Sequence, residues 1–265
     1  MELTPTERER YRRQMMLPGF GEIAQQKLKS TTVLVTGVGG LGGTVALYLA
    51  VAGIGKLILV RGGELQLDDL NRQILMTHDW VGKTRVVKAK ETLLQINPDV
   101  EIDAIPEYVT ADNIYDLVKQ ADISVDCAFD FTERNLLNDA CVRAQQPMIE
   151  AAMCDFDAYL TTIIPGLTPC LSCLFPEKPD WDRWGFGVVG AVSGTLACLA
   201  ALEVIKVITG LGEPLFGQLL TMNLANATFA KRRSYRDPHC PVCGQTSNQI
   251  SSFSSSTHLT QELSQ

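Results

Sequence analysis

From residue 32 to residue 153, short apolar runs alternate with longer segments in which apolar and polar residues are mixed. Short, mostly apolar runs predict strands, and longer runs of helical period predict helices. The predicted strands are 32–37, 56–63, 100–109, 122–128 and 147–153, and the predicted helices among them are 44–55, 83–97, 111–121 and 132–144. Strands that alternate with helices indicate a parallel sheet covered on both faces, because parallel neighbours require crossover connections.

The pattern changes after residue 153. The run 158–166 predicts an antiparallel strand, and 168–187, with its proline and tryptophan residues, predicts an irregular connection before an apolar helix that ends at Thr209. The predicted fold class is α/β, with a Rossmann-like, mostly parallel sheet that antiparallel strands continue. The predicted domains are 1–30, a polar helical segment, 31–245, the main domain, and 246–265, a disordered serine-rich tail.

The composition narrows the class of protein. With 46% hydrophobic and 20% charged residues, the 265-residue chain has the composition of a globular protein. Its formal net charge of −7 excludes a general nucleic-acid binder, because such proteins neutralise phosphates with clustered Lys and Arg. The N-terminal run MELTPTERERYRRQ is charged throughout and unlike a signal peptide, so we expect a cytoplasmic protein with reduced thiols.

One segment raises the question of a membrane. Residues 185–202 carry no charge and have the length at which a membrane helix becomes a candidate. Ser193, Thr195 and several glycines dilute the hydrophobicity, and Glu203 and Lys206 follow in the same helical run. The segment therefore favours a buried helix of a large core over a membrane span, and we expect no membrane partner.

A glycine-rich turn between the first strand and the first helix is the strongest candidate binding site. Gly37, Gly39, Gly40 and Gly42 give the spacing G-x-G-G-x-G. Glycines there allow backbone amides to approach phosphate oxygens, and the N-terminus of the following helix adds positive potential. The pattern favours nucleotide or anion binding, and a turn needed only for packing the strand against the helix is the alternative.

The end of the second strand decides which nucleotide the turn would suit. Dinucleotide enzymes place an acidic residue there to hold the ribose hydroxyls, whereas this chain has Arg61 in the run LILVRGGE. An arginine suits a 2′-phosphate, so an NADP-dependent oxidoreductase is one alternative. No acid or base for hydride transfer is evident farther along the chain.

Eight cysteines are present, and four of them form two C-x2-C pairs. The pairs are Cys170 with Cys173 and Cys240 with Cys243. Each pair can direct both thiolates to one metal, and two pairs complete a tetrahedral site, so the spacing predicts a structural zinc. A redox C-x-x-C is the alternative for either pair taken alone. We interpret the remaining cysteines as core residues: Cys127, Cys141, Cys154 and Cys198.

Several motifs, in this order, resemble one family. RYRRQ, GVGGLGG, DDLNRQ, INPDVEI and the pairs CLSC and CPVCG are similar to the ThiF/MoeB/HesA proteins, relatives of the ubiquitin-activating enzymes, over about residues 9–244. The resemblance implies a homodimer with a sheet of about eight strands, a structural zinc and a crossover loop at about 174–190. It also implies that ATP with Mg²⁺ serves to adenylate the C-terminal carboxylate of a ubiquitin-fold sulfur carrier.

The resemblance assigns roles to individual positions. The turn Gly37–Gly42 would lie along the nucleotide, and Arg13 would reach the phosphates of ATP in the neighbouring subunit. Arg72, in the motif RQ with Gln73, would contact the phosphates. Guanidinium groups suit this role because they offset the charge that builds on a transferring phosphoryl group.

Other positions depart from the family pattern. The catalytic lysine of the family aligns with Arg85, with Lys83 close by, so either side chain would be a second phosphate clamp. The aspartate that partners magnesium aligns with Phe129, and Asp130 follows one residue later as the predicted magnesium ligand.

More departures fall in the same predicted pocket. The family's acidic pair after the second strand is replaced by Arg61 and Gly63, and Asp69 stands where an amide is usual. Their concentration in one pocket indicates altered ligand use. The connection 175–190 contains no cysteine for a thioester, which leaves Cys154 as the remaining nucleophile candidate.

Within the family, the sequence looks most like the HesA branch, which is associated with nitrogen fixation and with metal-cofactor assembly. We predict ATP-dependent adenylation that serves metal-cofactor assembly, such as that of the nitrogenase molybdenum cofactor, or a sulfur carrier. A catalytically altered scaffold that docks a cofactor-assembly protein is the second prediction, and the NADP-dependent oxidoreductase is the third. An oxyanion such as molybdate is a further candidate ligand of the basic pocket.

Overall fold

The computed structural model describes residues 1–177 and 187–244. The predicted crossover loop at about 174–190 therefore lies partly outside the described residues, and the predicted tail 246–265 lies wholly outside them.

A single eight-stranded sheet, in the order β3-β2-β1-β4-β5-β6-β7-β8, forms the centre of the described fold. The strands are β1 Thr32–Thr36, β2 Lys56–Val60, β3 Glu101–Ile105, β4 Ile123–Asp126, β5 Met148–Cys154, β6 Asp157–Ile163, β7 Gln218–Asn223 and β8 Thr228–Arg233. From β3 to β5 neighbouring strands are parallel, and from β5 to β8 they are antiparallel. This arrangement confirms the predicted α/β class and mixed sheet.

The last two strands, β7 and β8, were not recognisable from the hydrophobic pattern. β8 has the sequence TFAKRR, and five of its six residues are exposed. β7 has a single fully buried residue, Met222. Strands at an exposed sheet edge have no strict alternation of apolar and polar residues, so only the family resemblance predicted the strand number.

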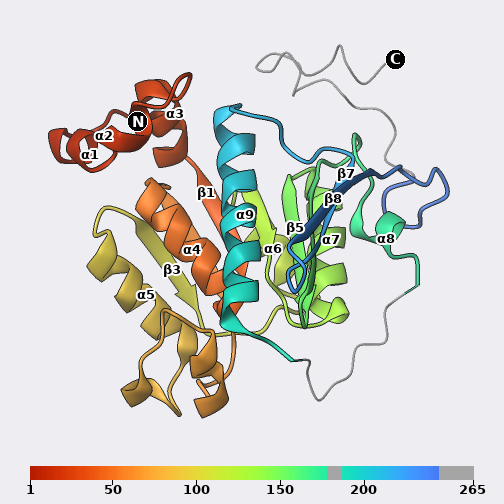
Figure 1. Ribbon diagram of the computed structural model, residues 1–265, viewed down its shortest axis with the longest axis horizontal. Coiled ribbons are helices and arrows are strands. Elements are labelled where there is room, and N and C mark those ends of the chain that lie inside the picture. The colour runs from red at the N-terminus through yellow and green to blue at the C-terminus, as the bar shows by residue number, and fades with distance from the viewer. Residues whose placement is uncertain (178–186, 245–265) are drawn as a thin grey trace.

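Helices cover both faces of the sheet (Figure 1). The helices are α1 Pro5–Arg10, α2 Arg12–Met15, α3 Gly21–Lys29, α4 Gly40–Ala52, α5 Arg85–Ile96, α6 Ile114–Val118, α7 Phe131–Ala144, α8 Leu171–Leu174 and α9 Gly190–Thr209, with short 3-10 turns η1 Leu67–Asn71 and η2 His78–Trp80. In β1, Val33 and Val35 face one core with α4, α5 and α9, whereas Leu34 faces the other core with α6 and α7. Alternate strand residues thus supply two cores, as a doubly covered sheet requires.

The long apolar helix α9 lies on the sheet beside α4 (Figure 1). Its length and composition would suffice to cross a membrane, and 44% of its most apolar window is buried within the described fold. Val192, Leu196, Ala200 and Val204 recur at intervals of four residues and face the core. The helix packs as a core element, which is the interpretation that the sequence favoured.

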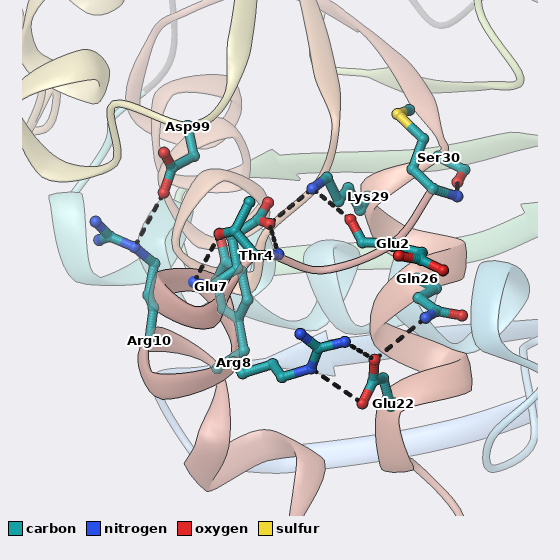
Figure 2. Close-up of polar contacts among 12 residues, drawn as sticks. Glu2, Thr4, Glu7, Arg8, Arg10, Glu22, Gln26, Lys29, Ser30 and Asp99 are labelled. Carbon is teal, nitrogen blue, oxygen red and sulfur yellow. Dashed lines mark hydrogen bonds and ion pairs between the residues drawn. The ribbon is translucent and has the colours of Figure 1, made fainter.

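Charged side chains join the N-terminal helix α1 to α3 and to the main fold (Figure 2). The carboxylate of Glu7 pairs with Lys29 Nζ at 2.7 Å and accepts the Thr4 amide in a helix capping box. Burial raises the pKa of Glu7, but the bonds from Lys29 and Thr4 outweigh it, so the pKa lies below its ordinary value. Arg10 Nε lies 3.6 Å from Asp99, which follows α5, so the N-terminal segment is held in place.

Candidate functional site

A cavity of about 570 Å³ opens where β1, β2 and β4 end. The residues that follow these strands line it, namely Gly37, Arg61 and Cys127. β1 and β4 are neighbours in the sheet, although the chain visits β2 and β3 between them. This is the position at which the strand order reverses, and open α/β sheets bind ligands there.

The glycine turn forms one wall of this cavity. Helix α4 begins at Gly40 rather than at the predicted residue 44, because the glycines themselves make its first turn. Gly37 has a φ of +134°, and a Cβ there would lie 2.6 Å from the Cys127 carbonyl oxygen. A Cβ at Gly42 would overlap the carbonyl of Gly37. Within the described part of the chain no side chain caps α4, so the amides of its first turn are available to an anion.

Arg72 and Arg85 meet at the carboxylate of Asp69. Arg72 Nη2 lies 3.0 Å from Asp69 Oδ1, and Arg85 Nη1 lies 3.5 Å from Oδ2. Burial, and then the charge of Arg61, lower the pKa of the Arg85 guanidinium. Asp69 therefore holds two cations at the cavity instead of facing a phosphate directly, which explains how an acid is tolerated at this position.

Gln73 lies deep in the same wall. The side chain is 4% exposed, and its Oε1 has no hydrogen-bond partner among the described residues. Its side-chain amide nitrogen is close to the glycine turn, 3.9 Å from the point where a Cβ of Gly39 would lie. Buried polar atoms are rarely left unpaired, so Gln73 is a candidate ligand contact.

Arg61 lines the cavity at the end of β2. Its Nη1 lies 3.4 Å from Glu133 Oε2, and its Cζ lies 5.5 Å from the centre of the Tyr108 ring. Burial raises the pKa of Glu133, and Arg61 opposes this effect. Neither Tyr108 nor Glu133 was recognisable from the sequence as a site residue, because each meets Arg61 only through the fold.

A buried cluster of Arg134 and two carboxylates supports the opposite side of the site. Arg134 is 3% exposed and lines the cavity, with Nη1 2.9 Å from Glu150 Oε1 and 3.3 Å from Asp126 Oδ2. Burial, and then Asp126, raise the pKa of Glu150 well above its ordinary value. Arg134 also donates to the carbonyl of Ala128, at 2.7 Å, so the cluster fixes the loop after β4.

Three predicted site residues lie elsewhere. Lys83 donates to the carbonyl of Asp79 and lies over the Trp80 ring, outside the cavity lining. Asp130 caps α7, where its Oδ1 accepts the amides of Thr132 and Glu133 at 2.8 and 3.0 Å. Arg13, on α2, is exposed. The cavity thus gathers the glycines, Arg61, Arg72, Gln73 and Arg85, but neither Lys83 nor Asp130.

The four paired cysteines converge at α8, on the face of the sheet that α6 and α7 cover. Their Sγ atoms all lie within 4.8 Å of one another. The Cys173–Cys243 and Cys170–Cys240 sulfur distances are 3.3 and 3.7 Å. A tetrahedral zinc with Zn–S bonds of about 2.3 Å requires sulfur separations of about 3.8 Å, so the donor set fits a metal ion of this kind.

The prediction that the other four cysteines are core residues is wrong for Cys154. Cys154, at the end of β5, is exposed rather than a core residue, because β5 ends there and turns into β6. Partial desolvation of its sulfur, followed by the charges of Asp155 and Asp157, raises the pKa of the Cys154 thiol. Cys127 lines the cavity, and burial and then Asp126 raise its pKa well above the ordinary value. Neither environment favours a thiolate nucleophile.

Comparisons with known proteins agree with this geometry. The profile described as the ThiF family matches residues 11–242. The chain is 72% identical over 244 residues to "Protein HesA" of Leptolyngbya boryana, covering 92% of this chain and 88% of that protein. It is 36% identical over 261 residues to the "Sulfur carrier protein adenylyltransferase" of Thermus thermophilus, covering 94% and 95%. The crystal structure of E. coli MccB with ATP gives a TM-score of 0.76 at 30% identity, covering 84% of this chain and 69% of that one.

Proposed function

Because the chain belongs to the ThiF family, we propose that it activates a carboxylate by adenylation, with ATP bound in the cavity beside the glycine turn. The observation that carries this proposal is the convergence of the uncapped N-terminus of α4 with Arg72 and Arg85 in one cavity. Amides and guanidinium groups that face one space suit a polyphosphate.

The chemistry follows from these groups. A carboxylate oxygen of the acceptor attacks the α-phosphorus of ATP, the bond from that phosphorus to the bridging oxygen breaks, and pyrophosphate leaves with the electron pair. Arg72 and Arg85 offset the charge that builds on the departing pyrophosphate. Asp69 holds both guanidinium groups in place before the reaction, so little reorganisation is needed.

The proposed acceptor is the carboxyl terminus of a ubiquitin-fold sulfur carrier. The support is the similarity to a protein named as a sulfur carrier adenylyltransferase. As a second partner we propose a protein of nitrogenase cofactor assembly, and the support for it is the resemblance of the sequence motifs to the HesA branch. We favour adenylation over an NADP-dependent oxidoreductase, because the chain belongs to the ThiF family.

We propose a cytoplasmic homodimer. Its support is the exposure of apolar side chains on two neighbouring helices, Tyr48 and Val51 of α4 and Leu202 of α9, which are 46%, 40% and 52% exposed. A second copy would cover these side chains. The fixed N-terminal segment then offers the exposed Arg13 to the partner's phosphates.

Magnesium would accompany ATP, but Asp130 does not fit the role of its ligand. The carboxylate of Asp130 caps α7 and does not line the cavity. Asp69 is engaged by two arginines. Among the described residues that line the cavity, Asp68 is the remaining carboxylate, and we propose that it holds the ion.

The four-cysteine site would hold a structural zinc, which joins the connection near α8 to the chain after β8. Replacing Cys240 by Ser should remove the metal and lower the melting temperature, since metal binding free energy is folding free energy. Cys198→Ser is the matched control, because Cys198 lies on α9 outside the cluster. Equal metal content in both variants would contradict the assignment.

Exchange of labelled pyrophosphate into ATP, with a sulfur carrier as acceptor, tests the proposed function. We expect exchange in the unaltered protein and at least a hundredfold loss in Arg72→Ala, since a lost charged hydrogen bond costs about 1.5–3 kcal/mol and the transition state carries more charge. Arg143→Ala is the control, because Arg143 stacks on Tyr115 away from the cavity.

A nucleotide-binding scaffold without turnover is the second candidate. The observation that favours it is Phe129, which lines the cavity at the position of the family's magnesium aspartate. Nucleotide binding without any pyrophosphate exchange would favour the scaffold over the enzyme.

A further inference from the structure

The cavity has two ends, one at the glycine turn after β1 and the other at Arg61 after β2, and these two strands are neighbours in the sheet. Thr36 of β1 pairs with Val60 of β2, so Gly37 and Arg61 leave neighbouring strands side by side. If the phosphates lie on the glycine turn, as in the proposed function on which this inference rests, the ribose lies toward the end of β2. The groups at that end then decide which sugar the site accepts.

Arg61 is held in a fixed position at this end. Glu133 pairs with one of its terminal nitrogens, and the Tyr108 ring lies against the guanidinium group. The side chain is 19% exposed and lines the cavity. An arginine has five N–H donors, and the Glu133 contact uses one of them, so donors remain for a ligand.

Arg85 lies near the same place. Its Nη2 donates to the carbonyl of Gly62 at 3.1 Å, and its buried Nε has no hydrogen-bond partner within residues 1–177 and 187–244. The side chain of Arg85 is 12% exposed. Two guanidinium groups therefore approach the end of β2 with donors still to be satisfied.

Two glycines, Gly62 and Gly63, follow Arg61 and lie in close contact with Tyr108. A Cβ at Gly62 would lie 2.5 Å from the Tyr108 ring, and one at Gly63 would lie 2.6 Å from the Tyr108 hydroxyl and 3.0 Å from Arg85 Nη2. Gly63 also has a φ of +82°. No acidic side chain fits at either glycine without displacing Tyr108, so the usual means of holding a ribose diol is excluded.

We propose that Arg61 binds a phosphate group carried on the ribose of an adenine nucleotide. The site then prefers a 2′- or 3′-phosphorylated nucleotide to one with a free diol. The fork of guanidinium donors on Arg61 matches phosphate oxygens. A ribose diol would instead donate hydrogen bonds to a carboxylate, and none of the residues 61–63 carries one.

Calorimetric titration of the full chain tests this preference. The probes are AMP, adenosine 2′,5′-bisphosphate and adenosine 3′,5′-bisphosphate, which differ only in the phosphate on the ribose. We expect one of the bisphosphates to bind about tenfold to a hundredfold more tightly than AMP. The stronger of the two identifies the position of the phosphate.

Variants assign the preference to Arg61. In Arg61→Gln, the ratio of bisphosphate to AMP affinity should fall to about one, and Arg61→Lys should keep part of it, because lysine retains the charge but not the fork. Arg143→Gln is the matched control, since that arginine also stacks on a tyrosine but lies away from the cavity. Circular dichroism confirms that each variant is folded.

The outcomes separate this inference from the proposed function. AMP binding as tightly as both bisphosphates overturns the inference, and adenylation still stands if pyrophosphate exchange is measured. A bisphosphate preference without exchange supports the inference and contradicts adenylation. A preference that survives in Arg61→Gln overturns the role of Arg61, and failure of every nucleotide to bind contradicts both proposals.

Discussion

The two ends of the cavity are built in different ways. At the end of β1, the surface is backbone: Gly37 and Gly42 permit contacts that no side chain would allow, and the first turn of α4 presents amides. At the end of β2, the surface is made of side chains, with Arg61 fixed by Tyr108 and Glu133. The first end suits any phosphate, whereas the second selects among ligands.

The two kinds of surface differ in how easily substitutions can change them. A surface of backbone amides depends on one local conformation, so substitutions there remove binding altogether. A surface of side chains from distant elements can exchange an acid for an arginine and keep the fold. The departures from the family pattern at Arg61 and Gly63 lie at the second end, which agrees with this view.

Gly37→Ala should give the largest effect, because it breaks the backbone-built end. The alanine would adopt a φ of +134° with its Cβ 2.6 Å from the Cys127 carbonyl oxygen. We expect a loss of about 3 kcal/mol in unfolding free energy and of measurable ATP binding. Urea unfolding and calorimetry measure both quantities.

Gly194→Ala is the matched control for that experiment. It lies within α9, and a Cβ there would meet nothing within 4 Å. This variant should gain about 0.5–1 kcal/mol of stability. Similar behaviour of the two glycine variants would contradict the role of the backbone at the β1 end.

Asp69→Asn should have the next largest effect and lies between the two ends. It removes the charge that holds Arg72 and Arg85, so the unfolding free energy should fall by about 2 kcal/mol. Pyrophosphate should bind about threefold more tightly, because a carboxylate no longer competes with it. Asp116→Asn, on the surface of α6, is the control. Weaker pyrophosphate binding would show that Asp69 orients the arginines more than it opposes the anion.

Glu7→Gln should have a smaller effect that depends on pH and spares both ends. The pKa of Glu7 in the folded protein lies below 4.5, so its stabilisation is present above pH 4.5 and is lost as the pH falls through the folded-state pKa. We expect a loss of about 1–2 kcal/mol at pH 7 and a vanishing difference in acid. Thermal unfolding at several pH values measures this. A difference that is independent of pH would contradict the ion pair with Lys29.

Tyr108→Ala should change stability least, because the tyrosine is 51% exposed. The loss should be about 0.5–1 kcal/mol, the value of an exposed cation–π contact. The bisphosphate preference should nevertheless fall, since Arg61 loses the ring that fixes it. An unchanged preference would indicate that Glu133 alone positions Arg61.

Local patterns predicted most of the sheet and the four-cysteine cluster. The apolar runs indicated the strands up to β6, and the two C-x2-C pairs do converge, because their spacing brings sulfurs together wherever the segments meet. The glycine spacing predicted the turn at the cavity. Each of these signals is a pattern within a few neighbouring residues, namely an apolar run, a C-x2-C pair or a glycine spacing.

The remaining features depend on contacts between distant residues. Glu133 lies 72 residues from Arg61 in the sequence, and no local pattern around either residue predicts that the two form an ion pair. Asp130 is a different case, because DFTE after a strand also matches the Asp-x-x-Glu signature of a helix N-cap, and this is the role its carboxylate has. The family motif predicted a magnesium ligand at Asp130, whereas the local N-cap signature predicted the helix cap that the structure has.

A crystal structure of the protein with a non-hydrolysable ATP analogue and Mg²⁺ would locate the nucleotide. We predict phosphates within hydrogen-bond distance of the amides of the first turn of α4 and of Arg72, with the ribose toward Arg61. An analogue bound elsewhere, or a cavity that remains without nucleotide at saturating concentration, would contradict it.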